Sequence, residues 1–190
     1  MASRPTASQT VGPFFSLGLT YLNRNNIVPD GTPGEKIKIR GKILDGDRQP
    51  IPDAIIETWQ ADAAGKFADE SNLQTTNQDP QRFSGFARIS TDENGTFELT
   101  TIKPGRLPSP GKGLQAPHIS VTIFMRGLLK QLNTRIYFPD EPGNDDDLLL
   151  KSIEPPRRAS LILRPTSGNS GVYQWDVLLQ GPDETVFLDV

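Results

Sequence analysis

Residues 35–44 read EKIKIRGKIL, and this stretch indicates the fold class. Polar and apolar residues alternate along it, so that Ile37, Ile39 and Ile43 lie on one face of an extended chain. Alternation with a period of two is typical of a β-strand with one buried face and one exposed face. We therefore expect a strand here whose isoleucine side chains point into a core.

Other short apolar segments follow, separated by residues that favour turns. The turn DGDRQP (45–50) is expected to close a hairpin onto residues 54–62. The turn TDENGT (91–96) is expected to join residues 83–90 to residues 97–102 in the same way. The later strand candidates are 118–124, 134–138, 159–165, 172–180 and 185–190.

About eight short strands with no regular strand–helix alternation predict an all-β fold. We expect an antiparallel β-sandwich of about eight strands over residues 34–190, with one short helix at GNDDDLLLKSI (143–153). Asn144 or a neighbouring aspartate can cap that helix, where acidic residues favour the N-terminal end of the helix dipole. No internal repeat interrupts this single domain.

Residues 1–33 are irregular and are expected to form an extended N-terminal arm. The arm contains the apolar residues Val11, Phe14, Phe15, Leu17 and Leu19, which is more apolar surface than a free polar tail carries. We therefore expect the arm to pack against another surface.

Composition excludes several classes of protein. The chain has 190 residues, a formal net charge of -3 and no cysteine. Acidic and basic residues are mixed along the chain, so no clustered basic segment indicates nucleic-acid binding. No apolar run has the ~20 residues of a membrane-spanning helix. The absence of an apolar leader segment predicts a cytoplasmic protein, and the absence of cysteine excludes thiolate metal sites.

The single histidine, His118, is the first candidate for chemistry. In HISVTIF (118–124) it is followed two residues later by Ser120, on the same strand face. A catalytic Ser-His-acid set would need a nucleophile elbow motif, which this sequence lacks. An ordinary hydrogen-bonded core histidine remains an alternative for His118. A carboxylate pair drawn from Glu57, Asp62, Asp69 and Glu70 is a second alternative, although acidic residues near a turn are usually only solvated. Trp59 is expected to be a core or interface side chain.

Five sequence segments carry a resemblance to a known family. They are SQTVGPFF (8–15), IETWQADAAGKF (56–67), FSGFARISTDENGTFELTTIKPG (83–105), APHISVTIFMRGLLKQLNTRIYF (116–138) and GPDETVFLDV (181–190). Together they resemble the intradiol ring-cleaving dioxygenases from Ser8 to Val190. Enzymes of that family hold non-haem ferric iron with two tyrosines and two histidines and cleave a catechol ring with O2.

Carried over by this resemblance, the four ligand positions fall on Phe67, Leu107, His118 and Ser120. Only one of them has a ligand of the family type, and a lone imidazole does not hold ferric iron against competing ligands. The resemblance is greater to the iron-free alpha subunit of a two-subunit member. It implies no catalytic and no metal-binding residue in this chain, and a Fe3+ ion held by a partner beta subunit.

The same resemblance implies a supporting role at the partner's pocket. Thr10, Gly12 and Pro13 in the arm would line the substrate cavity, and Phe14, Phe15 and Leu17 would anchor the interface. Arg126 would bind the carboxylate of the substrate, which the resemblance implies is protocatechuate, cleaved with O2 to 3-carboxy-cis,cis-muconate.

Other readings remain open. The arm could simply close its own sandwich, and Arg126 could be a solvated residue at a strand end. The whole chain could be a non-catalytic binding or carrier module with a vestigial metal site. It could also be a self-sufficient enzyme that uses Tyr21, Tyr137 or Tyr173 with carboxylates.

Overall fold

Strand β1 (Lys36–Leu44) lies at the centre of one of two sheets. The computed structural model describes residues 9–12, 14–68, 82–109 and 113–189. β1 pairs antiparallel with β4 (Thr96–Ile102) along its length. Its other edge pairs in parallel with β10 (Val172–Gln174) and β11 (Val177–Leu178), and β9 (Arg164–Pro165) pairs with β10. This first sheet is therefore mixed.

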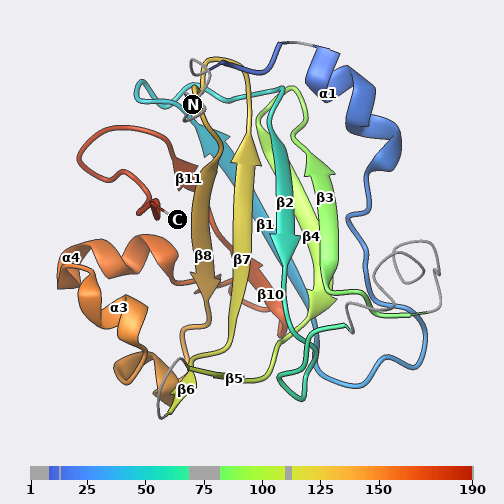
Figure 1. Ribbon diagram of the computed structural model, residues 1–190, viewed down its shortest axis with the longest axis vertical. Helices are drawn as coiled ribbons and strands as arrows, with labels where there is room; N and C mark the ends of the chain where they lie inside the picture. The colour runs from blue at the N-terminus through green and yellow to red at the C-terminus, as the bar shows by residue number, and fades with distance from the viewer. Residues whose placement is uncertain (1–8, 13, 69–81, 110–112, 190) are drawn as a thin grey trace, which may run out of the picture.

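The second sheet is antiparallel throughout. Its order is β3 (Phe86–Ser90), β2 (Ile55–Trp59), β7 (His118–Phe124) and β8 (Leu132–Tyr137). Figure 1 shows this sheet stacked in front of β1 and β4. A small ladder of β5 (Leu107–Pro108) and β6 (Leu114–Gln115) lies at one end. The predicted all-β sandwich is confirmed.

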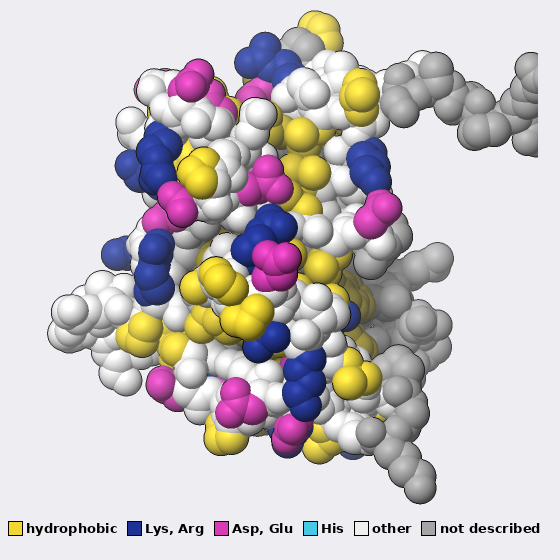
Figure 2. Space-filling view, turned by 90° about the vertical axis from the view of Figure 1, so that its left-hand side faces the viewer, with side chains coloured by type: hydrophobic (Ala, Val, Ile, Leu, Met, Phe, Trp, Pro, Cys, Tyr) yellow, Lys and Arg dark blue, Asp and Glu magenta, His cyan; other side chains and the backbone are white. Residues whose placement is uncertain are grey.

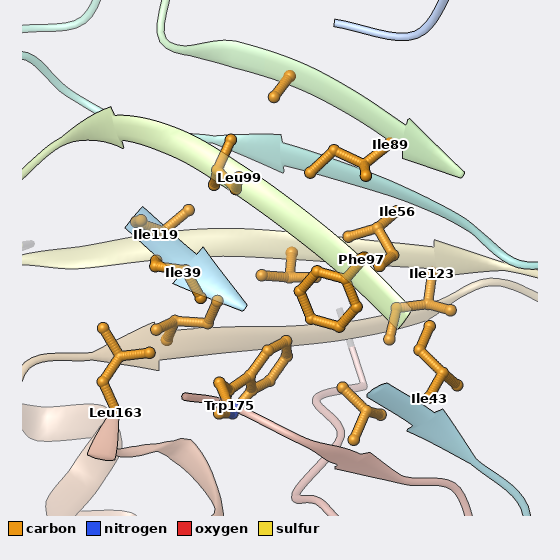
Figure 3. Packing of buried hydrophobic residues seen from close by; sticks show 14 of the residues in the cluster. Ile39, Ile43, Ile56, Ile89, Phe97, Leu99, Ile119, Ile123, Leu163 and Trp175 are labelled. Carbon is orange, nitrogen blue, oxygen red and sulfur yellow. The ribbon is translucent and has the colours of Figure 1, made fainter. Parts of the chain in front are cut away.

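The core lies between the two sheets and follows the predicted alternation. Ile37, Ile39 and Ile43 are buried, while the intervening lysines and arginine of β1 are exposed or half-buried. Figure 3 shows Phe97 and Leu99 of β4 facing isoleucines of the second sheet. The Phe97 and Trp175 rings meet edge to face with centroids 6.2 Å apart. Such burial of large apolar side chains is the main stabilising contribution to a sandwich of this kind.

Both predicted hairpins are wrong, because their turns connect one sheet to the other. β1 belongs to the first sheet and β2 to the second, and likewise β3 and β4 lie in different sheets. The turn at 91–96 has Gly95 at φ 68°, and a Cβ on Gly95 would lie 2.8 Å from the Ile43 carbonyl oxygen. A glycine is required there because the turn packs against the end of β1 as it crosses between the sheets.

The helical segments exceed the single helix that was predicted. The predicted segment contains η3 (Pro142–Asp145) and α3 (Leu148–Ser152), and Asp147 rather than Asn144 caps α3. Two further pieces, α4 (Pro155–Arg158) and η4 (Ala159–Leu161), follow; η4 takes up the first three residues of the strand predicted at 159–165, of which Arg164–Pro165 form β9. Proline at the first helical positions of η3 and α4 explains these starts, since its φ is already helical there.

The arm is not extended throughout. α1 (Phe14–Leu19) and η1 (Thr20–Leu22) form a short helical unit within it. Further along, Ile27 is fully buried in the main core, and Arg24 bridges to Arg88 of β3. The boundary at residue 33 stays a prediction. No helix in the described part of the chain has the length and apolar character needed to cross a membrane.

Candidate functional site

The outer face of the second sheet contains the residues singled out by sequence. Ile119, Val121 and Ile123 of β7 point into the core, so His118 and Ser120 lie on the opposite face. Cross-strand register places Ser120 between Trp59 of β2 and Arg135 of β8. This row of residues crosses the sheet at the start of β7.

The structure brings no metal-binding set together at the four expected ligand positions. Phe67 is 46% exposed and stacks on Trp59, with centroids 6.1 Å apart and planes 12° apart. Leu107 is buried in β5 opposite Gln115. Across the described ranges, no three His, Cys, Asp or Glu side chains gather as they would around a metal ion. The donors at the four positions are one imidazole and one hydroxyl.

His118 has the environment of a core histidine. It is 4% exposed, its Nδ1 lies 2.8 Å from the Ala116 carbonyl oxygen, and its ring packs against Tyr137. Burial, with a smaller contribution from the positive charge of Arg135, lowers the pKa of His118 from 6.5 to about 4. At neutral pH the ring is therefore uncharged, and Nδ1–H donates to Ala116.

Asp147 accepts hydrogen bonds from several groups at this end of the sheet. It is 1% exposed, and its Oδ1 accepts hydrogen bonds from the backbone N–H groups of Leu149 and Leu150 and from the Tyr137 hydroxyl. Its Oδ2 accepts from the Ala116 N–H at 2.9 Å. Burial raises the pKa of Tyr137 to about 12, so the phenol stays protonated and donates. Sequence reasoning included Asp147 among the possible caps of this helix but did not predict its hydrogen bonds to Ala116 and Tyr137.

Arg135 was missed by sequence reasoning. It is half-buried next to the former ligand positions, and its Nη1 donates to Gln115 Oε1 at 3.0 Å. The alternation of β8 places it on the outer face of the sheet, since Thr134 and Ile136 are its buried neighbours. A polar residue between two buried strand positions was the only available signal.

The arm residues lie at the opposite end of β7. The Gly127 N–H donates to Thr10 Oγ1 at 2.9 Å, and the Phe15 ring packs 5.5 Å from the Phe124 ring. Gly12 is exposed with open space around it, whereas Pro13 lies outside the described residues. In this structure the arm thus packs against its own sheet at the end of β7.

Arg126 forms an ion pair with a carboxylate of its own chain. Its Nε donates to Asp53 Oδ2, while 56% of the arginine side chain stays exposed. The Nη groups of Arg126 have no further protein acceptor among the described residues. Asp53 therefore holds the guanidinium by one edge and leaves its outer donors facing solvent.

The other candidate groups are engaged in structural contacts. Glu57 pairs with Arg88 at 2.5 Å, and Asp62 accepts from the N–H groups of Ala64 and Lys66 in a turn. Asp69 and Glu70 lie outside the described residues. The tyrosines also have separate environments: Tyr137 is buried against His118, Tyr173 packs on Phe138, and Tyr21 is 80% exposed.

Comparison with known proteins identifies similar chains. A family profile described as dioxygenase matches residues 11–181. The protocatechuate 3,4-dioxygenase alpha chain of Burkholderia cepacia is 39% identical, over 98% of this chain and 98% of that protein. The alpha chain of Pseudomonas putida is 34% identical over 97% and 96%. The beta chain from B. cepacia is 32% identical over 84% of this chain and 71% of its own length.

Solved structures share the fold. The dioxygenase domain of a dioxygenase carbohydrate-binding protein fusion from Streptomyces sp. SirexAA-E matches with a TM-score of 0.64 at 26% identity, over 86% of this chain and 89% of that chain. The 3-chlorocatechol 1,2-dioxygenase of Rhodococcus opacus 1CP matches with a TM-score of 0.63 at 22% identity, over 94% of this chain and 68% of that one. The second match carries information on the fold alone.

Proposed function

Since this chain belongs to the intradiol ring-cleavage dioxygenase family, we propose that it is the alpha subunit of a protocatechuate 3,4-dioxygenase. The observation that carries the proposal is the near full-length similarity to two alpha chains, at 39% and 34% identity. The supported reaction is the intradiol cleavage of protocatechuate by O2 to 3-carboxy-cis,cis-muconate. Both oxygen atoms of O2 enter the product, and no further reductant is needed.

The residues of this chain do not fit the ferric iron that the reaction needs. Phe67 and Leu107 have no donor atom, and Ser120 offers only a neutral hydroxyl. The Nδ1–H of His118 donates to the Ala116 carbonyl oxygen, and the half-buried Arg135 is the cross-strand partner of Ser120. A fixed positive charge at this position disfavours a trivalent cation. We therefore assign the iron to a beta subunit of the same family. No residue of this chain is expected to act as an iron ligand or as a catalytic group.

The arm and Arg126 supply the proposed contribution of this chain. Thr10, Gly12 and Pro13 would complete the partner's substrate cavity, and the free Nη groups of Arg126 would donate to the carboxylate of protocatechuate. The Asp53 contact supports that role because it fixes the orientation of the guanidinium before the substrate arrives. A pre-oriented guanidinium loses less conformational entropy on binding than a free arginine side chain.

Exposed apolar side chains on the arm support a partner at this end. Phe14 is 81% exposed, Leu17 69% and Tyr21 80%, all on α1 and η1. Large apolar and aromatic side chains that stay exposed within one segment are typical of residues buried by a permanent partner. The alternative that the arm only closes its own sandwich accounts for Phe15 but leaves these three residues uncovered.

Co-expression with a beta chain of the same source tests the assignment. The two chains should co-purify with iron in proportion to the beta chain, and the mixture should cleave protocatechuate. The isolated chain should contain only traces of iron. Near-stoichiometric iron in the isolated chain, with a visible tyrosinate-to-iron band, would contradict the assignment. Failure of the chains to associate would favour the non-catalytic binding module.

Deletion of residues 1–13 tests the role of the arm. We expect the truncated chain to fold, because residues 9–12, the described part of the deleted segment, lie outside the buried core, and we expect the assembled enzyme to lose most of its turnover. Gel filtration of the mixture, with a ring-cleavage assay of the assembled fraction, separates the two effects. Unchanged turnover in a correctly assembled complex would mean that the arm is only packing.

A further inference from the structure

Two adjoining cavities lie beside the former ligand positions, where β6, β8 and α3 meet. One has a volume of about 390 Å³ and is lined by Arg135, Gln115, Asp147 and Leu149 among others. The second has a volume of about 500 Å³ and is lined by Arg106, Leu114 and Asp146 among others. Ser109 and Leu148 line both cavities, so the two volumes share a wall. Their sizes are typical of small-molecule sites.

Two guanidinium groups meet at one residue between these cavities. Arg135 donates through Nη1 to the side-chain oxygen of Gln115 at 3.0 Å. Arg106 donates through Nη2 to the Leu114 carbonyl oxygen at 3.1 Å and lies 3.5 Å from the Gln115 carbonyl oxygen through Nε. Gln115 and its neighbour thus orient both arginines while using only part of their donor capacity.

Neither arginine forms an ion pair with the described part of the chain. Asp147 lines the first cavity, but its oxygens already accept from three backbone N–H groups and the Tyr137 hydroxyl. Asp146 lines the second cavity and pairs with Lys151 at 3.4 Å. Arginines that are oriented and left without a carboxylate can accept one from a ligand.

A third cavity shows the opposite arrangement. It has a volume of about 480 Å³, and its arginines are neutralised within the chain. Arg48 pairs with Asp183 at 2.9 Å, and Arg164 pairs with Asp176 at 2.7 Å. Figure 2 shows one face of the molecule, where basic and acidic side chains lie next to one another. Arg48 therefore provides a control arginine, because it lines a different cavity and its charge is balanced by Asp183.

We propose that the Arg106–Arg135 cavities form a binding site for a small organic monocarboxylate. The carboxylate lies between the two guanidinium groups, and an apolar body lies against Leu114 and Leu148, which are 47% and 65% exposed. The charge of the ligand follows from the acidic neighbours. Asp146 and Asp147 are close enough to line the cavities, so a dianion such as phosphate is repelled more than a singly charged carboxylate.

Titration of the isolated, iron-free full chain with benzoate tests this site. We expect saturable binding that shifts the NMR signals of the Gln115 side-chain amide and the Arg135 guanidinium. Arg135→Gln and Arg106→Gln should each weaken binding about tenfold or more, since each removes a charged hydrogen-bond donor. Arg48→Gln should leave the affinity unchanged. Inorganic phosphate should bind at least about tenfold more weakly than benzoate.

A steric variant keeps the test decisive if either arginine variant fails to fold. Leu148 is 65% exposed and lines both cavities, so Leu148→Trp should fill them without disturbing the core. It should abolish benzoate binding while the thermal unfolding temperature stays the same. Absence of saturable binding, equal loss in Arg48→Gln, or phosphate binding as tight as benzoate would overturn the proposal. Because the isolated chain is used, failure here leaves the proposed subunit function standing.

Discussion

Both ends of strand β7 carry residues that the sequence analysis named as candidates, but the two ends have opposite environments. At its start, His118 is 4% exposed, and the nearby Tyr137 and Asp147 side chains are buried and bonded to each other. Beyond its last residue, Arg126 keeps 56% of its side chain exposed, and the arm that packs there carries Phe14 with 81% exposed. We call these the closed end and the open end.

The comparison separates side chains that are bonded within this chain from side chains that stay exposed. At the closed end, internal hydrogen bonds satisfy the polar groups, so their energetic contribution is to this chain's own stability. At the open end, donors and apolar side chains remain without full burial, so their contribution depends on another molecule. Substitutions of the buried residues His118, Tyr137 and Asp147 at the closed end should therefore change folding stability, and substitutions at the open end should change activity or assembly.

The largest effect is expected from Asp147→Ala at the closed end. It leaves the buried N–H groups of Ala116 and Leu150 and the half-buried N–H of Leu149 without their acceptor, and we expect a loss of about 3–5 kcal/mol in the free energy of unfolding. Asp146→Ala is the matched control, because that exposed residue should cost less than about 0.5 kcal/mol. Urea denaturation of both variants measures the difference. Similar stabilities would remove the distinction between the two ends.

His118 should contribute to the pH dependence of stability. Its pKa is 6.5 when unfolded and about 4 when folded, so protons bind the unfolded state more strongly between these values. Stability is then complete above pH 6.5 and falls as the pH is lowered toward 4, by about 3 kcal/mol in total. Arg135, Tyr137 and Asp147 are the charged or titratable groups around it.

Denaturation at pH 7 and pH 4.5, with His118→Gln as the control, measures this dependence. The variant should lose most of the difference between the two pH values that the parent chain shows. A parent chain with equal stability at both pH values, or an NMR titration of His118 near pH 6.5, would show that the closed end is open to water.

At the open end, Arg126→Ala should change substrate use rather than folding. We expect kcat/KM for protocatechuate in the assembled enzyme to fall roughly 10- to 150-fold, because a charged hydrogen bond to the carboxylate is lost. Catechol lacks that carboxylate and should be affected little. Lys130→Ala is the control, since its pair with Asp189 is exposed. Equal losses for both substrates would point to assembly or pocket shape instead.

The smallest effect on this chain's own stability is expected at Leu17. Leu17→Ala and Leu148→Ala remove side chains of similar exposure, 69% and 65%, from the open and closed ends. Each should change the free energy of unfolding by less than about 0.5 kcal/mol. Only Leu17→Ala should weaken association with the partner, by about tenfold, measured by titration of one labelled chain with the other. Equal affinities would exclude Leu17 as an interface anchor.

Local pattern predicted the strands better than it predicted their partners. The alternation in residues 35–44 placed Ile37, Ile39 and Ile43 in the core, because side-chain period is a local property. The turns at 45–50 and 91–96 were wrongly predicted to close hairpins, since turn residues allow a reversal without determining which sheet follows. Packing between the sheets makes that choice.

The closed end was predicted only in part, for a related reason. His118 could be found as the single histidine, and a core position was one of its predicted environments. Asp147 and Arg135 could not be assigned, because their partners Ala116 and Gln115 lie 31 and 20 residues away in sequence. Contacts of that separation follow from the fold and leave no local pattern. The roles of Thr10, Gly12 and Arg126 stay predictions.

The parallel pairing of β1 with β10 and β11 has a consequence for synthesis on the ribosome. Lys38 pairs with Val172, and Ile43 pairs with Val177, so one edge of the central strand stays unpaired until residues 172–178 have been synthesised. The opposite edge finds β4 much earlier. A nascent chain therefore exposes an unpaired edge of a strand rich in isoleucine for most of its translation, which is a hazard for aggregation. The first sheet can close only after residues 172–178 have left the exit tunnel.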